Sequence, residues 1–140
     1  IGHTYPGKDT TSLAPIPQLL KRYPNLKLIL AHMGGGLPFY EMNTRYKELF
    51  QNVRYDTAAN PLLYDIKSIK TVISMVGPNR LLYGSDFPLL LYPSVKREMD
   101  FSLFIFFFFF LFIHDITQNA NLTEQEWIQF MGKNLLEFIT

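Results

Sequence analysis

The fold of this chain is decided by the stretch Arg80-Leu81-Leu82-Tyr83-Gly84-Ser85-Asp86-Phe87-Pro88. It contains a short apolar run that stops at Gly84, followed by a carboxylate at Asp86 and a proline at Pro88. A short apolar run bounded by turn-forming residues predicts a buried strand. Because Pro88 cannot continue the hydrogen bonding of a sheet, Asp86 is expected at the carboxyl end of that strand. In parallel α/β folds, this end of a strand is where catalytic groups are placed.

A second run of the same kind, Leu26 to Ala31, ends in His32 and is followed by the glycines Gly34 to Gly36. The glycines allow a backbone or a ligand to approach closely. His32 is either a proton-transferring or metal-binding side chain, or a histidine hydrogen-bonded within the core, and the sequence leaves both open. A phosphate-binding loop is weakly supported, since neither G-x-G-x-x-G nor the P-loop pattern is present. The oxyanion turn of lipase-like hydrolases would need a G-x-S-x-G elbow, which Gly84-Ser85-Asp86 does not supply.

The composition excludes several classes of protein. The 140 residues carry a formal charge of +1, which gives no argument for nucleic acid as a partner. The absence of cysteine excludes disulfides, thiolate metal sites and a cysteine nucleophile, and it is compatible with a cytoplasmic location. The first residues, Ile1-Gly2-His3, show no signal peptide and lack the initial Met, which predicts a fragment of a longer protein.

Alternating strands and helices predict an α/β fold with a parallel sheet. Helical spacing of apolar residues predicts helices over Pro15–Tyr23, Phe39–Phe50, Leu62–Val76 and Thr123–Phe138. Short apolar runs predict strands over Leu26–Ala31, Asn52–Asp56 and Arg80–Tyr83, and Ile1 is expected to end an earlier strand. A (β/α)8 TIM-type barrel needs about 250 residues. Residues 1–140 are therefore expected to form a partial barrel, about half of a complete one.

The carboxyl-terminal third contains a Phe-rich tract, Phe101 to Ile113, whose thirteen positions include one polar residue. This is fewer than the roughly 20 apolar residues that cross a bilayer as a helix, so a membrane anchor is disfavoured. The triplet at 103–105 recurs at 111–113, which indicates a low-complexity insertion at about 104–112. Extra turns of an apolar helix are an equal alternative. After the tract, Thr123 and Glu126 have the spacing of a capping box, which predicts the start of the last helix.

Further candidates for the site each have a structural alternative. Asp86 either takes part in chemistry or caps the turn after its strand. The same choice holds for Asp56, where the capping role is favoured. His3 lies in a loop flanked by glycines and is a candidate to line a pocket, and Lys8 is a candidate to bind an anionic group. His114, beside the Phe-rich tract, is expected to be a solvated helix residue.

Three motifs, in this order along the chain, resemble one known family. They are Leu30-Ala31-His32-Met33-Gly34-Gly35-Gly36-Leu37-Pro38-Phe39, Val53-Arg54-Tyr55-Asp56-Thr57-Ala58-Ala59 and Leu82-Tyr83-Gly84-Ser85-Asp86-Phe87-Pro88. They resemble the amidohydrolase-related (amidohydrolase 2) family, metal-dependent hydrolases and decarboxylases of the aminocarboxymuconate-semialdehyde decarboxylase type. Near the end, Gly132-Lys133-Asn134-Leu135 is similar to the closing helix of that family, which usually reads Gly-x-Asn-Ala. The resemblance covers the chain except about 94–121.

The resemblance implies strands five to eight of a metal-dependent (β/α)8 barrel. Asp86 would match the strand-eight aspartate that binds the metal and can take the proton of the bound water. His32 would match the strand-six histidine that polarises the substrate or assists proton transfer. The His-x-His of strand one is absent, and the strand-five histidine is expected upstream of Ile1, with His3 as a lesser candidate. The implied cofactor is a divalent metal, zinc first, in a site that this chain leaves incomplete.

The intact enzyme is then expected to act on a small carboxylated or amide substrate through metal-activated water, by hydrolysis or decarboxylation. His32 and Asp86 are the expected catalytic residues, and His3, Lys8 and Asp56 are expected at the substrate. The alternative is a non-catalytic barrel fragment without a complete metal site. Because a half barrel exposes sheet edges, such a fragment is expected to pair with another copy or with a missing amino-terminal half.

Overall fold

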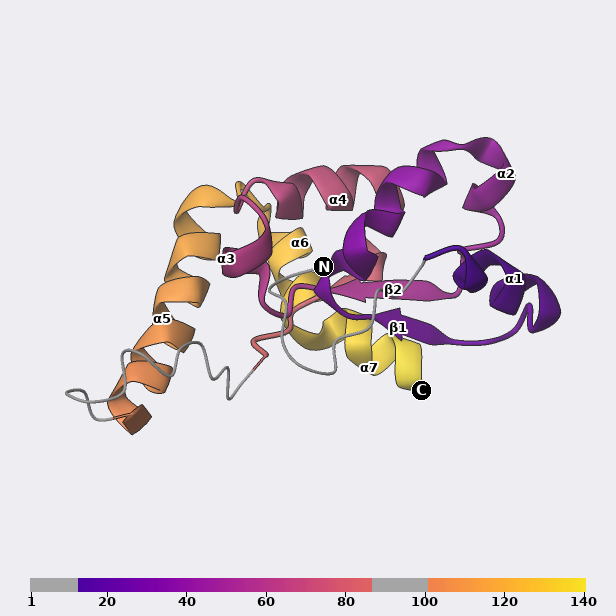
Figure 1. Cartoon of the computed structure of the whole chain (residues 1–140). Coiled ribbons are helices and arrows are strands. Elements are labelled where there is room, and N and C mark those ends of the chain that lie inside the picture. The colour runs from indigo at the N-terminus through magenta and orange to yellow at the C-terminus, as the bar shows by residue number, and fades with distance from the viewer. Residues whose placement is uncertain (1–12, 87–100) are drawn as a thin grey trace.

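The computed structural model describes residues 13–86 and 101–140, with the backbone alone over 101–109. Its sheet has three short strands, β1 (Leu28–Leu30), β2 (Val53–Asp56) and β3 (Leu81–Leu82), as Figure 1 shows. The strands are parallel and lie in the order β1-β2-β3. The parallel sheet confirms the predicted α/β class, although each strand is shorter than the apolar run that contains it.

Helices connect and cover the strands (Figure 1). The α-helices are α1 (Pro15–Arg22), α2 (Thr44–Lys47), α3 (Asn60–Leu63), α4 (Ser68–Val76), α5 (Phe101–Asn119), α6 (Glu124–Ile128) and α7 (Asn134–Ile139). Segments of 3₁₀ type form η1 (His32–Met42) and η2 (Pro78–Arg80), and a π-type turn forms η4 (Gln129–Lys133). The predicted insertion at 104–112 lies within α5 and stays a prediction.

Two predicted helices are interrupted by side chains that cap a new helical start. Within 39–50, Asn43 has an extended backbone, and its side chain accepts a hydrogen bond from the backbone N–H two residues later, at the start of α2. Within 62–76, Tyr64 is extended, and the Asp65 carboxylate accepts from the N–H two residues later, just before α4. Asn and Asp favour such local bonds over a continuous helix, which explains both breaks.

The two faces of β2 pack against different helices. Val53 and Tyr55 are fully buried on the side where η1 and α4 lie. Arg54 points to the other side, where its guanidinium lies 4.5 Å from the ring centroid of Phe138 on α7. Figure 1 shows the strands between α4 and α7. With both faces of β2 covered, the loops at the strand ends are what this part of the sheet can offer to a ligand.

The hydrophobic core extends from α1 to η4. Its buried members are Leu20, Met33, Leu37, Phe50, Val53, Tyr55, Ile69, Val72, Ile73, Leu81, Phe112, Ile116, Ala120 and Phe130. Tyr83, just after β3, joins α5 to the carboxyl-terminal helices, since its ring centroid lies 5.9 Å from that of Phe112 and 5.8 Å from that of Phe130. The carboxyl-terminal segment is thereby part of the same core.

The closing helices are fixed to the sheet by polar contacts. The capping box of Thr123 and Glu126 is present, with both of its hydrogen bonds, which confirms the predicted helix start. Asn134 is buried and donates to the carbonyls of Pro78, at 2.6 Å, and Leu81, at 2.8 Å. An amide at this position therefore holds α7 to the start of β3, which explains the asparagine of the Gly-x-Asn motif.

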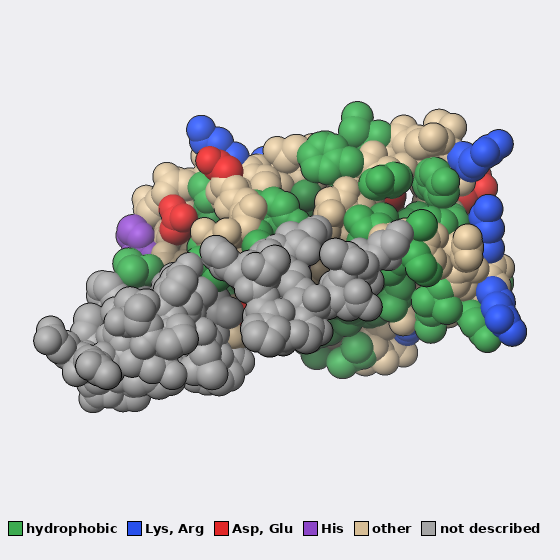
Figure 2. Space-filling view, viewed as in Figure 1, with side chains coloured by type: hydrophobic (Ala, Val, Ile, Leu, Met, Phe, Trp, Pro, Cys, Tyr) green, Lys and Arg blue, Asp and Glu red, His purple; other side chains and the backbone are tan. Residues whose placement is uncertain are grey.

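The surface combines charge with several large apolar side chains. Figure 2 shows hydrophobic side chains across the middle of one face and Lys and Arg toward its ends. Ile29 on β1 is 40% exposed, and His114 is exposed as expected. Among the described residues, β1 and β3 are the edge strands, and no helix is long and apolar enough to cross a membrane.

Candidate active site at the strand ends

Three loops meet at the carboxyl ends of the strands. His32 follows β1 by two residues, Asp56 is the last residue of β2, and the segment Gly84–Asp86 begins two residues after β3. Because the strands are parallel neighbours, these loops lie at one edge of the sheet. The site candidates of the sequence at 32, 56 and 86 therefore share one edge. His3 and Lys8 lie outside the described residues.

The loop after β1 is a left-handed turn. Five consecutive residues have positive φ: 56° at His32, 50° at Met33 and 59°, 64° and 93° at Gly34, Gly35 and Gly36. Glycine adopts this region without penalty, whereas each non-glycine residue costs about 1–2 kcal/mol. His32 and Met33 are thus held in a strained backbone, and such strain gathers at functional sites.

Gly34 also brings the turn close to the sheet. A Cβ atom on Gly34 would lie 2.8 Å from Cε1 of the Tyr55 ring, closer than any side chain allows. The turn therefore rests on Tyr55, the buried aromatic residue of β2. This close approach bears out one of the two roles that the sequence assigns to the glycines.

The imidazole of His32 has a defined orientation. Its Nδ1 lies 2.8 Å from the carbonyl oxygen of Ala58, and its carbonyl accepts a hydrogen bond from the hydroxyl of Tyr64 at 3.2 Å. A carbonyl oxygen only accepts hydrogen bonds, so we assign the proton of the neutral ring to Nδ1. Nε2 is then the nitrogen with a lone pair, available to a proton or a metal. The ring is half-buried, which leaves room for a ligand to reach it.

Asp56 connects the loop of β1 to the loop of β2. Its Oδ1 accepts from the backbone N–H of His32 and from that of Ala58, each at 3.0 Å. The carboxylate thereby holds the backbone of His32, and through Ala58 the acceptor of its ring. This geometry is the capping role that the sequence favours for Asp56, and binding of substrate by Asp56 stays a prediction.

Thr57 connects the loop of β2 to the loop of β3. Its hydroxyl donates to the carbonyl of Gly84 at 3.2 Å and accepts from the N–H of Gly84 at 3.1 Å, and its own N–H donates to Leu82. A Cβ atom on Gly84 would lie 3.1 Å from the nitrogen of Ala58 and 3.4 Å from the Asp56 side chain. Thr57 is not among the site residues expected from the sequence. Its place directly after the strand-end residue Asp56 is the signal that could have pointed to it.

Asp86 ends the described segment after β3. It is exposed and has a φ of 56°, so it lies in the left-handed region as His32 and Met33 do. Its position beyond a strand end agrees with the sequence, but the hydrogen bonds that join the three loops run through Asp56, Thr57 and Gly84. Asp86 thus lies two residues after Gly84, which is bonded to Thr57.

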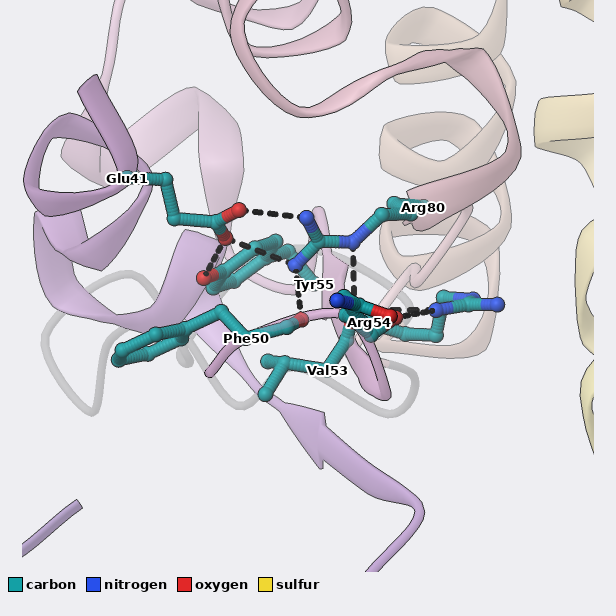
Figure 3. Close-up of polar contacts among 7 residues, drawn as sticks. Glu41, Phe50, Val53, Arg54, Tyr55 and Arg80 are labelled. Atoms are coloured by element: carbon teal, nitrogen blue, oxygen red, sulfur yellow. Dashed lines mark hydrogen bonds and ion pairs between the residues drawn. The ribbon is translucent and has the colours of Figure 1, made fainter. Parts of the chain in front are cut away.

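A buried ion pair, which was not predicted from the sequence, supports the strand ends. Figure 3 shows the Glu41 carboxylate facing the Arg80 guanidinium, with Tyr55 beside both. Arg80 donates to the two carboxylate oxygens at 2.5 and 2.7 Å, and the Tyr55 hydroxyl donates to one of them at 2.6 Å. Arg80 also donates to the carbonyls of Phe50 and Val53. Both charges are nearly fully buried, and together they fix the ring on which the turn of His32 rests.

Burial changes the acidity of the tyrosines around this edge. The pKa of Tyr55 is raised well above its ordinary value, first by burial and then by its hydrogen bond to Glu41. Burial also raises the pKa of Tyr64, whose hydroxyl donates to His32. Both phenols therefore remain protonated near neutral pH and act as hydrogen-bond donors.

The comparison with known proteins agrees with this geometry. A profile of the family described as Amidohydrolase matches residues 5–134. This chain belongs to the amidohydrolase family. The family has the TIM-barrel fold, and the three-stranded parallel sheet of this amidohydrolase chain is consistent with part of such a barrel.

Two curated relatives of this amidohydrolase chain are decarboxylases by name. It is 29% identical over 101 residues to 6-methylsalicylic acid decarboxylase of Penicillium expansum, covering 59% of this chain and 30% of that protein. It is 26% identical over 137 residues to 2-amino-3-carboxymuconate-6-semialdehyde decarboxylase of Dictyostelium discoideum, covering 86% of this chain and 33% of that protein. The chain thus spans about a third of the length of each relative.

Amidohydrolases generally use a divalent metal, and two of the described residues at the strand ends carry groups of suitable chemistry. Nε2 of His32 and the carboxylate of Asp86 are suitable donors. The described part of the chain contains no group of three or more His, Cys, Asp or Glu side chains that could hold an ion. The donor set in residues 13–86 and 101–140 therefore does not fit a complete metal site.

Proposed function

We propose that this chain forms the His32 and Asp86 part of a metal-dependent amidohydrolase active site that acts on a small carboxylated substrate. The observation that carries this proposal is the fixed imidazole of His32, with Nδ1 bonded to the Ala58 carbonyl and Nε2 available at the strand ends. The family profile and the two decarboxylase relatives support the same class of chemistry. Because both relatives are decarboxylases by name, we favour loss of carbon dioxide over hydrolysis as the proposed reaction.

The chemistry of His32 suits this reaction. When a carboxylate leaves as carbon dioxide, the bonding electron pair stays on the substrate carbon, and that carbon must take up a proton. A protonated His32 can supply the proton from Nε2, while Nδ1 keeps its hydrogen bond to the Ala58 carbonyl in both charge states. The ring therefore need not turn when it gains or loses a proton.

The remaining site residues have proposed roles around this proton donor. Asp86 is proposed as the metal ligand and acid–base partner from this chain, and zinc is the divalent metal we propose for the whole protein. His3 and Lys8 are proposed to contact the substrate, Lys8 through a carboxylate group. Asp56 is proposed to act mainly by holding His32, in agreement with its two backbone hydrogen bonds.

The test combines turnover with metal content. Release of carbon dioxide from 6-methylsalicylic acid and related small carboxylic acids is measured with added Zn²⁺ or Mn²⁺, for the wild type, His32→Gln and Asp86→Asn. His114→Gln is the matched control, because His114 is an exposed histidine on α5. For the whole protein that contains this chain, we expect turnover in the wild type and the control, loss of turnover in both site variants, and loss of bound metal in Asp86→Asn.

The competing function is a non-catalytic barrel fragment that pairs with another chain through its exposed edge. The large exposed apolar side chains, including Ile29 on the edge strand β1, favour such pairing. A folded wild type that binds no metal and releases no carbon dioxide would overturn the enzymatic proposal. Sedimentation would then show a dimer, and the coding sequence upstream of Ile1 would lack the His-x-His of a first strand.

A further inference from the structure

We infer that Thr57 is a positioning residue. Its hydroxyl fixes the Gly84–Asp86 segment next to Asp56 and Ala58, the two residues that hold His32 in place. The inference rests on the proposed function, because it assigns Thr57 the task of presenting His32 and Asp86 to one substrate. It adds a role for a side chain that has no place in the proton transfer itself. Thr57 is fully buried and lies between Asp56 and Ala58, the two residues that hold His32.

The first support is the hydrogen bonding of Thr57. One hydroxyl both donates to and accepts from the same residue, Gly84, and the Thr57 backbone N–H donates to Leu82 at 3.2 Å. These three bonds attach the end of β2 to the end of β3 beyond the last paired residues of the sheet. A sheet alone would leave the segment after Leu82 without this anchor.

The second support is the packing at Gly84, which is independent of the hydroxyl. The backbone of Gly84 lies so close to Ala58 and Asp56 that an added Cβ atom would meet the Ala58 nitrogen at 3.1 Å. Gly84 is not in the left-handed region, so glycine is favoured here by the close approach rather than by the backbone conformation. The loop of β3 therefore presses against the residues that orient His32.

Both ends of this connection carry backbone strain. His32 and Asp86 have φ values of 56°, in the left-handed region that non-glycine residues rarely adopt. Strained residues persist only where the surroundings hold them in several ways. Asp56 holds His32 by two routes, and Thr57 holds Gly84, two residues before Asp86. The hydroxyl of Thr57 is thus the contact whose loss would release one catalytic segment from the other.

The test uses Thr57→Val, which keeps the shape and removes the hydroxyl, and Thr57→Ser, which keeps the hydroxyl. Ring-nitrogen NMR of the 140-residue chain reports the His32 tautomer, with His32→Gln to assign the signal. Amide exchange reports Gly84, with Gly77 as the control amide because it donates to Ile73 at the end of α4. Turnover of the carboxylic acid substrates is measured in parallel.

We expect the neutral His32 ring to be protonated at Nδ1 in the wild type and in Thr57→Ser, and to lose this preference in Thr57→Val. Exchange of the Gly84 amide should be about tenfold faster in Thr57→Val, while that of Gly77 is unchanged. The ratio kcat/KM should fall about a hundredfold through kcat, since a catalytic group displaced by about 1 Å costs about that factor. Thr57→Ser should restore all three measurements.

A second variant guards against misfolding of Thr57→Val. Gly84→Ala pushes the same contact apart from the other side and should produce the same change in the His32 ring. A wild-type His32 signal and wild-type Gly84 exchange in Thr57→Val would overturn the inference, as would equal defects in Thr57→Val and Thr57→Ser. If the wild type has no turnover, the proposed function fails, whereas the NMR and exchange results still decide the role of Thr57.

Discussion

Replacing Glu41 by Gln is expected to be among the most destabilising single changes in this chain. The Glu41 side chain is 2% exposed and accepts three hydrogen bonds, two from Arg80 and one from Tyr55. A glutamine keeps one acceptor oxygen, but its NH2 group would point at an N–H group of Arg80, so that two hydrogen-bond donors would face each other. The variant therefore leaves a buried guanidinium without its counter-charge, which costs about 3–5 kcal/mol.

Two companion variants separate the charge from the hydrogen bonds. Tyr55→Phe removes one bond to a charged acceptor while the ion pair remains, so it should cost about 1.5–3 kcal/mol. The double variant Glu41→Leu with Arg80→Met removes both charges. The carbonyls of Phe50 and Val53 lose Arg80 as a hydrogen-bond donor in this variant, but each carbonyl still accepts a hydrogen bond from another donor. The double variant should therefore be more stable than Glu41→Gln.

Urea denaturation at pH 7 is the suitable assay, because urea is uncharged and does not screen the ion pair. Total stability of a domain is about 5–15 kcal/mol, so the expected loss for Glu41→Gln is a large fraction of it and a large shift of the midpoint. A loss below about 1 kcal/mol for Glu41→Gln, or a double variant less stable than Glu41→Gln, would refute the argument that the pair is a buried, mutually dependent unit.

Three further changes test the local arguments. In urea denaturation, Gly34→Ala should destabilise the fold clearly more than Gly36→Ala. Both positions have a positive φ, but of the two only Gly34 lies where an added Cβ atom would meet another side chain. Asn134→Leu should lower the free energy of unfolding by several kcal/mol, since two carbonyls lose their hydrogen-bond donor. Asn60→Leu should be neutral or stabilising, because the Asn60 amide is equally buried but makes no hydrogen bond within the described part of the chain. Burial raises the pKa of Tyr83 to about 12 from an unfolded value of about 10, so the free energy of unfolding should fall between pH 10 and 12 as the unfolded chain alone ionises, and less steeply in Tyr83→Phe.

Much of the architecture could be predicted because its signals are local. The strands follow short apolar runs bounded by turn-forming residues, and their alternation with helices indicates a parallel sheet. The capping box at Thr123 is likewise a pattern within four residues. The breaks at Asn43 and Asp65 were missed for a related reason, since an Asn or Asp within a helical pattern shows its preference for capping only when the following residues are considered with it.

The buried ion pair could not be predicted, because its partners are far apart in the sequence. Glu41 and Arg80 are separated by 39 residues, and each looks locally like a charge at the edge of an apolar run. The weak signals were an acidic residue within the apolar stretch 37–42 and an arginine directly before a buried strand. Neither signal names a partner, and pairing follows only once β2 and β3 are neighbours.

The candidate site divides in the same way. His32, Asp56 and Asp86 were identified because strand-end residues with proton or metal chemistry stand out in a sequence. The contacts that orient them, from Ala58, Thr57 and Gly84, involve backbone atoms or a small side chain without acid–base chemistry. Such residues have no chemical signature, although one of them, Ala58, decides through its carbonyl which nitrogen of His32 is available.

The Glu41–Arg80 ion pair and the candidate site are connected through the ring of Tyr55, so the pair supports the site as well as the stability of the fold. Tyr55 donates to Glu41 and lies directly against Gly34, in the same left-handed turn as His32. A turn with two non-glycine residues at positive φ needs support that does not yield, and Tyr55 is that support. If this is correct, Tyr55→Phe should leave the ring in place and preserve the Nδ1 proton of His32, whereas Tyr55→Leu should lose both stability and the tautomer. A His32 ring signal that is the same in the two variants would show instead that the Ala58 carbonyl alone orients the imidazole.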